Sequence, residues 1–192
     1  MHNTIITDLK FANSNLEFFD SKDVEIIGVN AFINCWQLKK VILRKNVRLL
    51  GSGAFKNCNN LKTVEIDKDS KIPFIPNECF KNCHSLENIK LPKYTIDIST
   101  SAFKNCTKLE KIDITASTIN IDDDAFIDCL ALQEIDGADS ITKIGNNAFS
   151  NCKNLQMLSA KNCLHIGEKA FKDCECLEKI QLNIDMISQW CF

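Results

Sequence analysis

The sequence has little of what indicates nucleic-acid binding, membrane insertion or export. Lys and Arg total 23 against 25 Asp and Glu, so the basic surface typical of a nucleic-acid-binding protein is not expected. No run approaches the roughly 18 consecutive apolar residues of a membrane-spanning helix. Residues 1–20 lack a basic start followed by an apolar run, and therefore do not read as a signal peptide. We expect neither nucleic-acid binding nor membrane insertion, and these features alone favour a cytoplasmic location.

Groups that support catalysis or hold cofactors are equally sparse. The three histidines, His2, His84 and His165, are far apart, and there is no G-x-S-x-G, no H-E-x-x-H and no glycine-rich phosphate loop. The acidic run 122–124 could contribute metal ligands, but it lies where we expect a helix to start, and carboxylates stabilise that end of a helix. The sequence therefore predicts no catalytic residue, no cofactor site and no metal site.

What the chain does contain is a repeat with a period of about 23 residues. The frame AFINCWQLKKVIL returns in related form up to AFKDCECLEKIQL, and its phenylalanines are Phe32, Phe55, Phe80, Phe103, Phe126, Phe149 and Phe171. A fixed period of this length is typical of a solenoid. Residues 1–23 fit the frame poorly, and the chain ends on a new start, ISQWCF. We predict an amino-terminal cap or degenerate repeat over 1–23, followed by a repeat array over 24–192 whose last repeat is incomplete.

Each repeat combines two local patterns. Residues such as Ala31, Phe32 and Cys35 occur at i, i+1 and i+4, which favours one side of a short helical turn. The L-x-x-V-x-L segment that follows alternates as a half-buried strand does. Because no single repeat can bury its apolar face, the repeats must stack. The prediction is an α/β solenoid, a right-handed curved rod of seven to eight coils with short helical turns and a parallel β-sheet. The insertion at 72–76 is expected to bulge outward.

Eleven cysteines and a column of Asn or Asp accompany the repeat. Seven cysteines hold one position and are predicted to be small buried hydrophobes rather than disulfide or metal partners. They are Cys35, Cys58, Cys83, Cys106, Cys129, Cys152 and Cys174. Cys163 and Cys176 lie off this column, where a functional thiol stays the less favoured alternative. The Asn or Asp before each column cysteine is expected to bond to nearby backbone groups at the turn.

The frame as it stands in IGNNAFSNCKNLQML and IGEKAFKDCECLEKIQL resembles the BspA-like leucine-rich repeats, also called the Treponema pallidum type. That family is known from bacterial surface proteins and from parasitic protists. The resemblance implies a non-catalytic protein-interaction module, adhesin-like, at the cell surface or secreted, with protein partners.

The candidate partner-binding surface is the outward side of the strand segments, which is polar and of alternating charge. Its residues are Lys40, Ile42, Arg44, Thr63, Glu65, Asp67, Asn88, Lys90, Lys111, Asp113, Thr115, Glu134, Asp136, Met157, Ser159, Lys161, Lys179, Gln181 and Asn183. A merely solvated face is the alternative. Two further functions stay open: self-assembly into homo-oligomers through the carboxyl end at Trp190, Cys191 and Phe192, and an intracellular scaffold or regulator of one partner.

Overall fold

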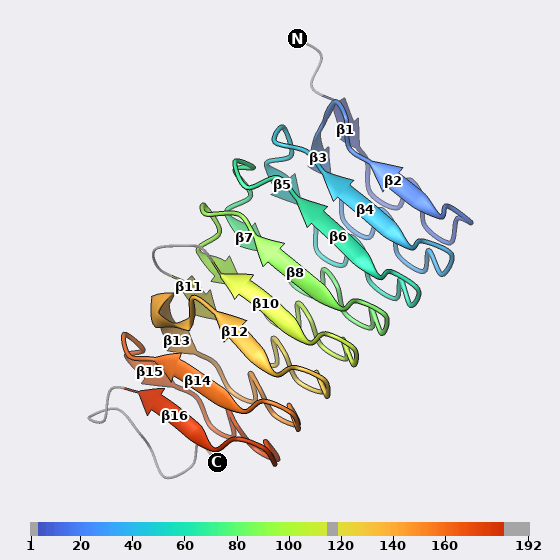
Figure 1. The fold of residues 1–192 in the computed structure, drawn as a ribbon. Coiled ribbons are helices and arrows are strands. Elements are labelled where there is room, and N and C mark those ends of the chain that lie inside the picture. Colours follow the sequence, from blue (N-terminus) through green and yellow to red (C-terminus); the bar gives the residue numbers. More distant parts are fainter. Residues whose placement is uncertain (1–3, 115–118, 183–192) are drawn as a thin grey trace.

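The computed structural model describes residues 4–114 and 119–182. The chain winds into a parallel β-solenoid of about eight coils, with one strand of each coil in a front layer and one in a back layer (Figure 1). The front strands are β2 (Phe18–Asp20), β4 (Lys40–Leu43), β6 (Thr63–Ile66), β8 (Asn88–Leu91), β10 (Lys111–Ile114), β12 (Glu134–Asp136), β14 (Met157–Ala160) and β16 (Lys179–Leu182).

The back strands are shorter and complete each coil. They are β1 (Thr4–Ile6), β3 (Val24–Ile27), β5 (Leu49–Leu50), β7 (Phe74–Ile75), β9 (Asp97–Ile98), β11 (Ile119–Ile121), β13 (Ile141–Ile144) and β15 (His165–Ile166). They divide into two sheets between β5 and β7, where the inserted segment 72–76 separates the coils. Its two prolines lack the N–H groups that a continuous ladder needs.

Equivalent residues of neighbouring coils pair in register. Lys40 to Leu43 lie opposite Thr63 to Ile66, and the pairing is parallel throughout both layers. Parallel pairing follows from a repeat that returns to the same face after each turn. The predicted parallel β-solenoid is thus confirmed.

The predicted short helical turns are wrong: within the described residues the only helix is the 3-10 turn η1 (Ala138–Ser140). Two residues of each turn are left-handed, as Asn30 is with φ 52° and Asn34 with φ 59°. Such residues cannot continue an α-helix. Backbone bonds run between coils instead, for example from Phe32 N to Ala54 O at 2.8 Å. The i, i+1, i+4 spacing of apolar residues is therefore met by consecutive tight turns.

The core between the layers is built from columns of identical residues. The repeat phenylalanines stack with ring centroids about 5 Å apart, as Phe103 does on Phe80 at 5.3 Å and on Phe126 at 5.1 Å. Each column cysteine lies beside them, and its thiol donates to the carbonyl of the preceding coil's phenylalanine. Cys106 Sγ lies 3.1 Å from Phe80 O. A small apolar residue that also carries a weak donor suits this position.

The first coil, residues 4–20, extends these columns although its sequence fits the frame poorly. Phe11 stacks on Phe32 with centroids 5.0 Å apart, and β1 and β2 pair with β3 and β4. Asn13 occupies the Asn column with φ 60°. The domain boundary after residue 23 stays a prediction.

Candidate binding face

The front layer presents its outward residues in two rows, from β2 to β12 and again along β14 and β16, because alternate residues of paired strands point the same way. One row runs through Phe18, Lys40, Thr63, Asn88, Lys111, Glu134, Met157 and Lys179. The second runs through Asp20, Ile42, Glu65, Lys90, Asp113, Asp136, Ser159 and Gln181. Of the other predicted residues, Arg44, Asp67 and Lys161 are exposed just beyond the strands, whereas Thr115 and Asn183 lie outside the described residues.

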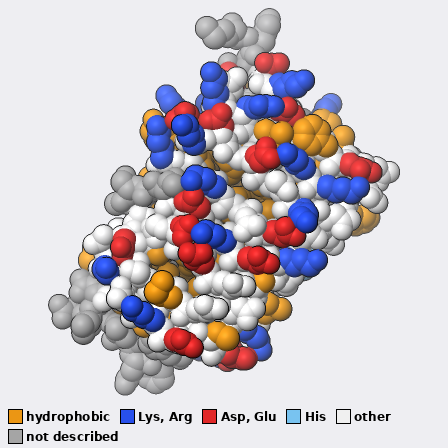
Figure 2. Space-filling model, in the orientation of Figure 1, with side chains coloured by type: hydrophobic (Ala, Val, Ile, Leu, Met, Phe, Trp, Pro, Cys, Tyr) orange, Lys and Arg blue, Asp and Glu red, His pale blue; other side chains and the backbone are white. Residues whose placement is uncertain are grey.

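Charges on this front face are paired between coils. Lys40 Nζ lies 2.6 Å from Glu65 Oε1, and Arg44 forms a two-point contact with the carboxylate of Asp20, so that its guanidinium lowers the pKa of Asp20. Lys111 Nζ bridges two carboxylates. Figure 2 shows basic and acidic side chains side by side over the front strands. The amino-terminal part of the face is consequently ordered and of mixed sign rather than a field of one charge.

The front layer is interrupted once within the described residues, between β12 and β14. β12 pairs only with β10, and β14 only with β16. Elsewhere a backbone bond joins the residues that precede successive front strands, as from Gln133 N to Glu110 O at 2.9 Å and from Glu178 N to Gln156 O at 3.1 Å. No such bond joins Gln156 to Gln133. The strands part here and leave a hollow of about 390 Å³ that opens on the front face.

Gly137 follows β12 at the interruption and lines the hollow. It occupies the position that Leu43, Ile66 and Ile114 hold in other coils, and its φ of 77° turns the chain out of β12 after three residues. An added Cβ would lie 1.9 Å from Ile114 O. The following Asp139 replaces the missing strand bonds, since its carboxylate accepts from Ser159 Oγ at 3.0 Å. The coils therefore stay joined while the hollow stays open.

Replacing Gly137 by alanine is expected to reduce the free energy of unfolding by about 2 kcal/mol or more, because a left-handed alanine is strained and the methyl group has no room. Urea unfolding followed by circular dichroism measures this. Gly53→Asn is the matched control, since Asn30 and Asn147 hold the same place in their coils with φ 52°. If Gly137→Ala lowers the free energy of unfolding no more than Gly53→Asn does, Gly137 is not conformationally required.

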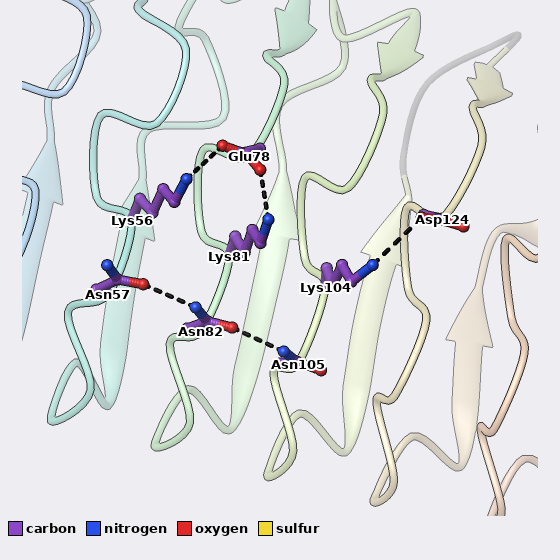
Figure 3. A network of polar contacts seen from close by, with 8 residues as sticks. All are labelled: Lys56, Asn57, Glu78, Lys81, Asn82, Lys104, Asn105 and Asp124. Atoms are coloured by element: carbon purple, nitrogen blue, oxygen red, sulfur yellow. Dashed lines mark hydrogen bonds and ion pairs between the residues drawn. The ribbon is translucent and has the colours of Figure 1, made fainter.

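The turn edge carries the Asn column and a set of ion pairs (Figure 3). Asn82 Nδ2 donates to Asn57 Oδ1 at 2.7 Å, and Asn105 Nδ2 donates to Asn82 Oδ1 at 2.8 Å. The expected bonds from this column to backbone groups are therefore replaced by side-chain bonds between coils. Glu78 accepts from Lys56 and Lys81, which together lower its pKa. These contacts join neighbouring coils, so the Asn column has a structural role.

Asn82→Asp is expected to destabilise the folded chain by about 1–2 kcal/mol at pH 7, because a carboxylate would face the Asn57 oxygen with no proton between them. The new carboxyl would have a raised pKa in the folded state, so its protonation at lower pH restores a donor. The deficit relative to wild type should shrink as the pH falls toward 4. Urea unfolding at both pH values tests this, with the exposed Asn154→Asp as the control. A stability deficit that does not change with pH would argue against the hydrogen-bonded column of Asn side chains.

The other thiols and acids of residues 4–114 and 119–182 are mostly buried or paired with neighbouring groups. Burial raises the pKa of Cys83 and Cys129 well above the ordinary value. Cys163 is buried and Cys176 is exposed. Asp122 pairs with Lys143, and Asp123 accepts from Asn146 N, so the acidic run is divided among different partners rather than capping a helix. Among residues 4–114 and 119–182, no group of three or more His, Cys, Asp or Glu side chains could hold a metal ion.

Sequence reasoning predicted the rows from Lys40 onward but missed Phe18, Asp20 and the hollow. The residues that line it include Gln133, Gln156 and Asp139, none of which was predicted, beside the predicted Glu134, Asp136, Met157 and Ser159. A signal was present in the sequence, because Gly137 stands where the frame otherwise has Leu, Ile or Ala.

Comparison with known proteins agrees with this geometry. A family model for the BspA-type leucine-rich repeat region, in six copies, matches residues 4–93 and 73–192. No curated protein matches the sequence. In the part of the chain that the structure describes, no helix has the length and apolarity needed to cross a membrane.

Three solved structures show the same fold. A leucine-rich cell surface protein from Faecalibacterium prausnitzii A2-165 is 24% identical over 92% of this chain, with a TM-score of 0.52. The alignment spans only 34% of that protein's own chain, about a third of its length. The T. pallidum leucine-rich repeat protein is 22% identical, with coverage of 79% and 82% and a TM-score of 0.56. A leucine-rich repeat protein from Eubacterium ventriosum is 21% identical, with coverage of 72% and 43% and a TM-score of 0.58.

Proposed function

The chain belongs to the BspA-type leucine-rich repeat family, and on that premise we propose that it is a non-catalytic module that binds a protein partner on its front face. The observation that carries the proposal is the pair of in-register rows, which offer side chains at a regular strand spacing on a rigid support. Their charges are held in ion pairs between coils. Such preorganised groups lose less conformational entropy when a partner binds.

An adhesin-like role at the cell surface is the finer form of this proposal. One protein of similar fold, from Faecalibacterium prausnitzii, is described as a leucine-rich cell surface protein. Self-assembly through Trp190, Cys191 and Phe192 is the alternative, and those residues lie outside the described part of the chain. Light scattering over a concentration series separates the two, because a self-assembling chain grows in mass with concentration and a free-standing module does not. An intracellular scaffold is the third candidate, and localisation of the native protein distinguishes it from an adhesin.

Site-directed photo-cross-linking tests the binding face. A photoreactive amino acid at Ile42 on the front face should capture a discrete partner from native cells and their surroundings, whereas the same probe at Asn120 in the back layer should not. Charge reversal of Lys40 and Lys90 together should abolish the capture. Equal capture from front and back, or no discrete product from the front, would overturn the proposal.

A further inference from the structure

The hollow between β12 and β14 is the one place, among the described front strands, where the sheet is not continuous. Outward residues elsewhere on the face stand on paired strands. Here the edges of β12 and β14 face each other without the usual bonds, and the opening between them holds about 390 Å³. A volume of this size admits one long side chain from outside. Interface hot spots are commonly single side chains seated in such pockets.

Charge decides which side chain fits. The lining residues include the acids Glu134, Asp136 and Asp139 and no Lys or Arg. The nearest cation toward β10 is Lys111, whose Nζ lies 3.0 Å from Glu134 Oε2 and 2.7 Å from Asp136 Oδ2. One ammonium group thus serves two carboxylates, which also interact with each other. An anionic ligand would be repelled, and a cationic one attracted.

The remaining lining groups favour a guanidinium over a compact ammonium. Gln133 and Gln156, which carry carboxamide groups, line the hollow from the two sides of the break. Met157 is 51% exposed and offers an apolar thioether against which a methylene stem can pack. Arginine carries donors in a planar fork on such a stem, so it can reach acceptors that lie in several directions.

We propose that the β12–β14 hollow is an arginine-binding pocket, which receives an arginine side chain from a basic segment of a protein partner. The inference rests on the proposed function, because the pocket opens on the front face and the partner's backbone would continue across the rows. The two are nevertheless separable, since a partner bound only over β4 to β8 would leave the hollow empty.

The test uses the full chain and a short glycine–serine peptide with one central arginine. Titration followed by amide NMR should shift resonances of β12 and β14 saturably and leave those of β4 unchanged. Replacing the arginine by citrulline, its neutral isostere, should weaken binding about tenfold, as expected for loss of charge-assisted hydrogen bonds. Equal binding of the two peptides, binding of neither, or shifts centred on another part of the chain would each overturn the proposal.

Protein variants complete the test. Glu134→Gln together with Asp136→Asn should weaken arginine-peptide binding about tenfold, and Met157→Lys should abolish it by placing an ammonium group in the hollow. Glu65→Gln is the matched control, because Glu65 also pairs with a lysine on the front face but lies in β6. The same variants are then used in cross-linking from Ile42. Capture that survives Met157→Lys but not reversal of Lys40 and Lys90 would leave the proposed function intact and overturn the pocket.

Discussion

Raising the pH from 8 to 10 is expected to destabilise the folded protein strongly, because folding makes five of its buried thiols harder to ionise. Burial raises the pKa of Cys79, Cys83, Cys106, Cys129 and Cys152 above the ordinary value of 9.0. In the unfolded chain the same thiols lose their protons from about pH 9 upward. A group whose pKa is raised by folding stabilises the folded state fully below its unfolded pKa, and that stability is lost as the pH rises.

The expected size of this effect is large. Each buried thiol favours unfolding by about 1.4 kcal/mol at one pH unit above its unfolded pKa. Five such thiols acting together would remove much of the roughly 5–15 kcal/mol by which a typical domain is stable. Urea unfolding under reducing conditions, repeated at half-unit pH steps, measures how steeply the free energy of unfolding falls as the pH rises.

A double variant provides the control for the thiol account. Cys106→Ala with Cys129→Ala removes two ionisable groups and two S–H···O bonds. It is expected to be less stable at pH 7, yet its stability should decline less steeply between pH 8 and 10. A slope equal to that of wild type would show that other groups cause the alkaline destabilisation.

Most of the fold could be predicted because the sequence repeats with a regular period. The interval between Phe32 and Phe55 and its successors fixed which residues would stack, and the L-x-x-V-x-L alternation placed the front strands. The turns were mispredicted because apolar residues at i, i+1 and i+4 suit a helix and a run of tight turns equally. What decides between them is the set of bonds between coils, which no single repeat contains.

The residues with left-handed backbone also show that contacts between coils decide the turn conformation. Asn30 and Asn34 are residues that adopt positive φ readily, so their spacing could have warned against a helix. Glu78 and Lys169 hold the equivalent place with φ 57° and 55° although neither residue type favours it. Stacking on neighbouring coils imposes that conformation. The outward rows were likewise readable from alternation, whereas the hollow lies beside a glycine that breaks the pattern.

Phe103→Ala is expected to reduce the free energy of unfolding by about 3–5 kcal/mol, because it opens a cavity in the middle of the core. The ring is completely buried and lies between Phe80 and Phe126 with nearly parallel planes, at 12° and 4°. Its removal deprives both neighbours of a stacking partner, and the coils cannot close the gap without breaking their in-register backbone bonds.

Phe18→Ala is the matched control, since Phe18 is 50% exposed on the front face and lies at the end of its row. Phe18→Ala should reduce the free energy of unfolding by well under half as much as Phe103→Ala does. Urea unfolding compares the two variants, and amide hydrogen exchange locates the damage. Because each coil contacts chiefly its neighbours, protection should fall most in the coils that contain Phe80, Phe103 and Phe126 and least near the first coil. A uniform loss of protection along the chain would instead mean that the solenoid unfolds only as one cooperative unit.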